Sequence, residues 1–152
     1  MTRVDFYLLS EASGSVVAAV CRLCEKAANA GHRLYVRTPD PALADEMDGA
    51  LWSFKQGGFI AHERLGRAAI EDPQPPVLIG GAEPPPTHHG VLINLGDDIP
   101  TWFSTFERVL EVVPASDTGR AKSRERFRFY RERGYELKTF EQNAEGGWQA
   151  KT

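Results

Sequence analysis

Short apolar segments alternate with segments of helical periodicity along the chain, and this alternation most constrains the fold. The segments "VDFYLL" (residues 4–9) and "RLYVRT" (33–38) are typical of buried strands, because apolar, aromatic and β-branched side chains follow one another directly. Further strands are predicted at 76–80, 90–96 and 135–140. Strands that alternate with helices predict a three-layer α/β domain with a mostly parallel sheet.

Helix signals fill the gaps between these strands. Asp40 as N-cap with Pro41 as the first helical residue is the strongest start signal. Ser13 or Ser15 can cap the first helix, and Gly31 can end it in the left-handed conformation. The predicted helices cover residues 14–31, 40–52, 100–113 and 118–133.

Length and composition fit one domain. The chain has 152 residues, of which 41% are hydrophobic and 26% are charged, as in ordinary globular proteins. We expect a single domain over residues 1–140 and a flexible tail over 141–152. The first residues lack a secretory layout and the apolar runs are short, so we expect a cytoplasmic protein without a membrane partner.

The sequence carries no sign of a nucleotide site. The first predicted strand-to-helix turn, "LLSEASGSV", contains neither GxGxxG nor a P-loop, and Glu11 would repel phosphate. We therefore predict a doubly wound α/β domain without a nucleotide-binding loop and without a cofactor. No residue pattern indicates catalysis, and a nucleotide-using α/β enzyme is kept as the less favoured alternative.

Two patterns resemble metal or redox sites. Cys21 and Cys24 form a CxxC, but they fall in the middle of a predicted helix, so two reduced core cysteines are favoured over a redox pair or a zinc site. His88 and His89 lie in a Pro-rich segment, where solvated loop residues are favoured over a metal or catalytic role.

The last predicted helix concentrates positive charge. Residues 119–140 hold eight basic and three acidic residues, a net charge of +5, so the rest of the chain sums to −8. On a helical wheel four arginines form one stripe, bordered by Phe127 and Tyr130. The four are Arg120, Arg124, Arg128 and Arg131.

Arginine at all four positions favours a docking site for an acidic and partly apolar ligand over a merely solvated helix face. Nucleic acid is a weaker candidate, because a chain with a pI near 5.8 repels phosphate elsewhere on its surface.

Several segments, in order and at matching spacing, resemble one family. They are "VDFYLL", "DGALWSF", "GGFIAH", "PVLI", "VLINL", "FERVLEVVP" and "SRERFRFYRERGYEL". Together they resemble the chi subunit of bacterial DNA polymerase III holoenzyme, a clamp-loader accessory protein, over about residues 4–137. The resemblance implies a non-catalytic replisome adaptor with a Rossmann-like fold and no nucleotide.

The resemblance also implies two partners. One is the acidic C-terminal tail of single-stranded DNA-binding protein, which ends in Pro-Phe. Its site then falls on Arg124, Phe127, Arg128 and Arg131, where Arg128 stands in place of the lysine sometimes found in the family.

The other implied partner is the psi subunit, which joins chi to the clamp loader. Its surface then falls on Trp52 and Phe59 of "LWSFKQGGF", although core packing of Trp52 is the alternative that the residues alone favour. A helicase or a repair protein is the alternative partner for the same surface.

Overall fold

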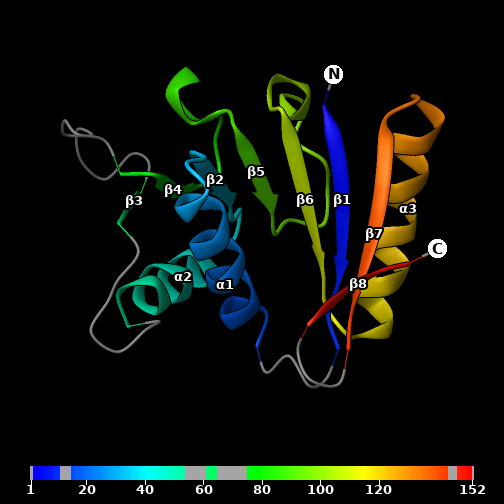
Figure 1. Ribbon diagram of the computed structural model, residues 1–152, viewed down its shortest axis with the longest axis horizontal. Coiled ribbons are helices and arrows are strands. Elements are labelled where there is room, and N and C mark those ends of the chain that lie inside the picture. The colour runs from blue at the N-terminus through cyan, green and yellow to red at the C-terminus, as the bar shows by residue number, and fades with distance from the viewer. Residues whose placement is uncertain (1, 11–14, 54–60, 65–74, 144–146, 152) are drawn as a thin grey trace.

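One sheet runs through the molecule, and helices cover both of its faces (Figure 1). The computed structural model describes residues 2–10, 15–53, 61–64, 75–143 and 147–151. In these residues the strands are β1 (Arg3–Leu8), β2 (Leu34–Arg37), β3 (His62–Arg64), β4 (Val77–Gly80), β5 (Val91–Asn94), β6 (Arg108–Val113), β7 (Glu136–Gln142) and β8 (Trp148–Ala150). The helices are α1 (Val16–Asn29), α2 (Pro41–Ser53) and α3 (Asp117–Glu132), with 3₁₀ turns η2 (Pro86–His88) and η3 (Phe103–Thr105).

The described residues give an eight-stranded sheet in the order β3-β4-β2-β5-β6-β1-β7-β8. Every neighbouring pair is parallel except β7 with β8. The predicted α/β class with a mostly parallel sheet is confirmed. β3 lies at one edge of this sheet, and β7 with β8 at the other.

Alternating strand residues divide the core into two layers. Tyr7, Val36 and Ile93 pack with α1 and α2, whereas their neighbours Phe6 and Tyr35 pack on the opposite face with α3. The side-chain period of two in a strand explains this division. Both faces are covered, which is the arrangement expected of a parallel sheet.

The predicted helix ends are largely confirmed. The Ser15 hydroxyl accepts a hydrogen bond from the Ala18 backbone N–H at 3.0 Å, and the Asp40 carboxylate accepts one from Ala42 N–H at 3.0 Å before Pro41 opens α2. Gly31 follows α1 with φ +89°, and the glycine after α3 has φ +79°. Positive φ values of this kind are where glycine is favoured.

The predicted helix over residues 100–113 is wrong. Residues 103–105 form the 3₁₀ turn η3, and β6 occupies Arg108–Val113 between β5 and β1. A strand buried on both faces appears in sequence as a continuous apolar run, which a buried helix segment also produces. The β-branched Val109, Val112 and Val113 fit the strand better.

Two strands lie in segments where none was predicted. β3 pairs with β4, and β8 pairs antiparallel with β7 inside the predicted flexible tail. Trp148 of β8 packs edge-on against Tyr7, with ring centroids 5.0 Å apart. This aromatic contact stabilises the pairing of β8 with β7, which a purely polar segment would not do.

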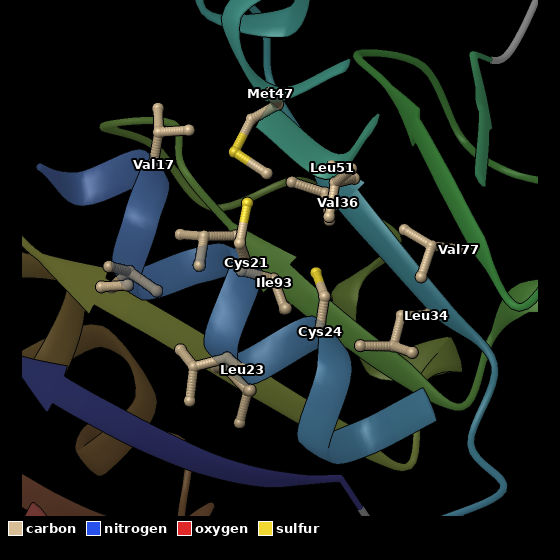
Figure 2. Close-up of a cluster of buried hydrophobic side chains, with 14 of the residues drawn as sticks. Val17, Cys21, Leu23, Cys24, Leu34, Val36, Met47, Leu51, Val77 and Ile93 are labelled. Carbon is tan, nitrogen blue, oxygen red and sulfur yellow. The ribbon is translucent and has the colours of Figure 1, made fainter. Parts of the chain in front are cut away.

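The two cysteines lie in the core between α1, α2 and the sheet (Figure 2). Cys21 and Cys24 are each 0% exposed and not joined in a disulfide, among Val36, Met47 and Ile93. The interpretation as core cysteines is confirmed. Burial raises the pKa of the Cys21 thiol to about 11 and raises the pKa of Cys24 further still.

We therefore predict that neither thiol reacts in the native state. Ellman's reagent at pH 8 should label the folded chain very slowly, because both sulfurs are buried and protonated, and should label two thiols per chain in urea. Ser53→Cys, at the exposed end of α2, is the positive control and should react at once. Rapid labelling of native Cys21 or Cys24 would contradict this placement.

Candidate functional site

Helix α3 carries the basic stripe and is defined at both ends. Ser116 caps its start, where the hydroxyl accepts a hydrogen bond from Gly119 N–H at 3.0 Å, and Asp117 lies in the first turn. One side of α3 is buried through Ser123, Arg126 and Tyr130. The helix is therefore fixed in rotation, and its other side faces outward.

Three stripe arginines, Arg124, Arg128 and Arg131, lie on that outward side. Among the described residues none of the three forms an ion pair with a carboxylate, so their charges are available to a ligand. Arg120 behaves differently: it is half-buried, and its Nη2 donates to the Leu9 carbonyl at 2.7 Å.

Phe127 lies between the stripe arginines and the sheet. It is half-buried, and its ring packs edge-on against Phe6 with centroids 5.3 Å apart. The guanidinium carbon of Arg131 lies 5.9 Å from the centre of the same ring, at cation–π distance. Phe127 thus joins the core on one side and offers apolar surface beside cations on the other. Tyr130, the second aromatic beside the stripe, is fully buried.

The four residues predicted as one site are brought together. Arg124, Phe127, Arg128 and Arg131 line a shallow depression of about 240 Å³. A second depression of about 220 Å³ adjoins it, and Arg124 and Phe127 line both. The two depressions make a continuous surface in which cations surround an aromatic ring, which suits a ligand with both carboxylates and an apolar group.

One arginine of α3 has a different role, which the helical wheel did not single out. Arg126 is 6% exposed, and its Nε donates to the Glu111 carboxylate at 3.0 Å. Glu111 is fully buried on β6 and also accepts from the Tyr130 hydroxyl at 2.7 Å and from the Asn94 amide at 3.1 Å. Two features of the sequence could have indicated this ion pair. One is the carboxylate inside the apolar run "VLEVV", and the other is the position of Arg126 next to Tyr130 on the helical wheel.

This buried network extends across the carboxyl ends of the strands. Arg37 of β2 donates to the Asn94 side-chain carbonyl and to the Asp98 backbone carbonyl, both at 3.0 Å, and Asn94 in turn donates to Glu111. Burial and the Glu111 carboxylate raise the pKa of Tyr130, so its hydroxyl keeps its proton and remains a donor. The network ties α3 to β2, β5 and β6.

A second exposed feature lies at the opposite edge of the sheet. Trp52, near the end of α2, is 60% exposed and is the exposed large hydrophobic residue of the described chain. Its ring meets His62 of β3 edge-on, with centroids 5.4 Å apart. The core alternative for Trp52 is therefore wrong. Phe59, predicted to share this surface, lies outside the described residues.

His88 and His89 both pack against other parts of the protein. His88 is fully buried, so its interpretation as a solvated loop residue is wrong; its Nε2 lies 2.7 Å from the Pro75 carbonyl, and burial lowers its pKa. His89 stacks on Phe106 with centroids 4.6 Å apart.

In the described parts of the chain, no three His, Cys, Asp or Glu residues gather as a metal site would need. The helices described there are too short or too polar to span a membrane.

Comparison with known proteins identifies the family. The family model "DNA polymerase III chi subunit, HolC" matches residues 1–138. The chain belongs to this family. It is 44% identical over 138 residues to DNA polymerase III subunit chi of Pseudomonas aeruginosa, with 90% of this chain and 94% of the relative covered.

More distant relatives carry the same name. The chain is 27% identical to DNA polymerase III subunit chi of Haemophilus influenzae, over 89% of this chain and 94% of the relative. It is 26% identical to the chi subunit of Escherichia coli, over 91% of this chain and 97% of the relative. The chain is accordingly a chi-family subunit of DNA polymerase III, a non-catalytic accessory subunit in DNA replication.

The buried Arg126 and the exposed Arg128 allow a direct comparison on one helix. Arg126→Ala should lower the free energy of unfolding by about 3 kcal/mol or more, because Glu111 would be left as a buried charge without its cationic partner. Arg128→Ala should change it by less than about 0.5 kcal/mol. Urea unfolding followed by circular dichroism measures both. Equal stability of the two variants would contradict the structural role of Arg126.

Proposed function

We propose that this chi-family chain is an adaptor that links the clamp loader, through a psi-type subunit, to the acidic C-terminal tail of single-stranded DNA-binding protein. The observation that carries the proposal is the convergence of Arg124, Phe127, Arg128 and Arg131 on one outward-facing depression of α3. The family resemblance implies a tail site on these same four residues.

The chemistry of the depression suits that ligand. Carboxylates of an acidic tail can pair with arginine guanidinium groups in two-pronged hydrogen bonds, which are stronger than neutral ones. The terminal Phe of the tail can lie against Phe127, whose outward side is still accessible. A ligand that combines both groups gains from the cations and from the aromatic surface at once.

Nucleic acid fits this surface less well. The chain has a formal net charge of −3, and outside residues 119–140 the charge is −8, so a long polyanion would be repelled beyond α3. A short peptide tail needs only the local patch. Charge distribution therefore favours a peptide ligand over single-stranded DNA.

Two separate surfaces are what an adaptor needs. α3 lies at the β7 end of the sheet, whereas α2 with Trp52 lies at the β3 end (Figure 1). Partners on these surfaces would not compete for the same residues. Tethering then raises the effective concentration of the clamp loader at template DNA coated with many binding-protein tails, even where each tail binds weakly.

The tail site can be tested by charge reversal. Arg128→Glu should weaken binding of an acidic peptide that ends in Pro-Phe by about 2 kcal/mol or more, because a charge-assisted hydrogen bond is replaced by repulsion. Fluorescence anisotropy of a labelled peptide measures the affinity. Arg22→Glu, on the exposed side of α1, makes the same charge change on the other face of the sheet and should bind as the wild type does.

The same titration separates the alternative ligands. A single-stranded oligonucleotide of equal charge should bind more weakly than the peptide at 0.1 M salt, where exposed charges are screened beyond about 10 Å. If Arg128→Glu stays folded and binds the peptide with unchanged affinity, Arg128 is not in the site. If the oligonucleotide binds more tightly than the peptide, α3 recognises nucleic acid instead.

The second surface is tested at Trp52. Trp52→Ala should abolish capture of a psi-type subunit while leaving tail-peptide affinity unchanged, because the indole is exposed and lies at the other edge of the sheet. Pull-down with the variant measures capture, and a thermal melt checks that the fold is retained. Undiminished psi capture would exclude Trp52 from the interface, and recovery of a helicase in place of psi would favour the alternative partner.

A further inference from the structure

The second depression on α3 includes a cation from the far end of the chain. Its volume is about 220 Å³, and residues of α3, β1 and β7 line it together with Lys151. Apolar side chains and cations both line it. They are Phe6, Leu8 and Phe127 on the apolar part and Arg120, Arg124 and Lys151 on the charged part.

The depression has the right size and polarity for an aromatic ring. Phe6 and Leu8 are 2% and 9% exposed, so their side chains form the base, and half-buried Phe127 forms a wall. For comparison, an apolar cavity of about 150 Å³ accommodates benzene. No Asp or Glu among the described residues lines the depression, so its three cations are not neutralised by a lining acid.

Strand pairing fixes Lys151 in this position. β8 pairs antiparallel with β7, and the Lys151 backbone N–H donates to the Thr139 carbonyl at 2.8 Å, one residue beyond the strand. Trp148 packs with Tyr7 and Phe140 on the face that α1 and α2 cover. Because side chains alternate along an extended segment, Lys151 faces the other way, toward α3.

β8 also lies outside the part of the chain that matches the family model. The match ends at residue 138, before most of β7 and all of β8. Arg120 and Arg124 come from the matched part, and Lys151 from the segment beyond it. Lys151 is thus the cation of this depression that comes from beyond the matched residues, and Thr139 of β7 is the other lining residue from that segment.

We propose that Lys151 is a specificity-determining residue of the peptide site, and that its ammonium pairs with the terminal α-carboxylate of the bound tail. This inference rests on the proposed function above. When the terminal Phe ring of the ligand occupies the apolar base, the α-carboxylate of that same residue is the ligand acid nearest to the lining cations. Arg124 lines the depression from α3, and Lys151 lines it from the segment after β8. Lys151 then favours ligands whose terminal aromatic residue carries a free C-terminal carboxylate.

The experiment compares two peptides on variants of the full chain. The peptides are an acidic Pro-Phe tail with a free carboxylate and the same sequence ending in a carboxamide, both titrated by fluorescence anisotropy. Lys151→Ala should weaken the free-acid peptide about threefold to fivefold, the scale of one exposed ion pair. The amide peptide should bind wild type and Lys151→Ala with the same affinity, because the partner charge is absent.

Charge reversal supplies the matched control. Lys151→Glu should weaken the free-acid peptide about tenfold or more through repulsion. Lys138→Glu makes the same charge change on β7, but by the alternation of the strand it faces away from Thr139 and the depression, so it should retain wild-type affinity. Thermal melts confirm that both variants are folded.

The outcomes separate this inference from the proposed function. If Arg128→Glu loses peptide binding and Lys151→Glu does not, Lys151 is not in the site and the adaptor proposal stands. If Lys151→Glu and Lys138→Glu weaken binding equally, the loss comes from the change in net charge of the protein, and the inference is wrong. If Lys151→Ala weakens acid and amide peptides alike, the α-carboxylate assignment is wrong. If wild-type protein binds neither peptide, the proposed function fails and this inference fails with it.

Discussion

The buried ion pair between Arg126 and Glu111 is the interaction on which the candidate site depends. It joins α3 to β6, and its geometry is completed by the Tyr130 hydroxyl and the Asn94 amide, so the carboxylate is satisfied although it is fully buried. Burial of a charge is costly unless it is paired and hydrogen-bonded, so one rotation of α3 is strongly favoured over others. That rotation directs Arg124 and Arg128 outward.

A single helix therefore carries both an anchoring arginine and the arginines of the proposed peptide site. Arg126 is an anchor because it faces a buried acid, and Arg128, two residues along, is exposed because the helix has turned by about 200°. Phe127 combines both roles, because one side of its ring packs against Phe6 and the other side is accessible to solvent. Support from the core is what holds a recognition surface in a defined geometry. The same sheet places α3 and Trp52 at its opposite ends, so the two surfaces of the proposed adaptor are separate.

Much of the fold could be predicted because its signals are local. The caps at Ser15 and Asp40, and the apolar runs of β1 and β5, depend on residues close in sequence. β6 was missed because periodicity alone does not distinguish a short buried strand from a segment of a buried helix. β8 was missed because its pairing depends on contacts with β7 and with Tyr7, which lies far away in the sequence.

The sequence by itself determined that arginines and an aromatic ring would share one face of a helix, since helical spacing alone brings Arg124, Phe127, Arg128 and Arg131 together. It also identified the family. Only the tertiary structure decided which basic residues are structural and which are available, because that depends on whether an acid such as Glu111 lies opposite in space. It decided as well that Lys151 reaches the same surface, since strand pairing joins segments that no local pattern connects.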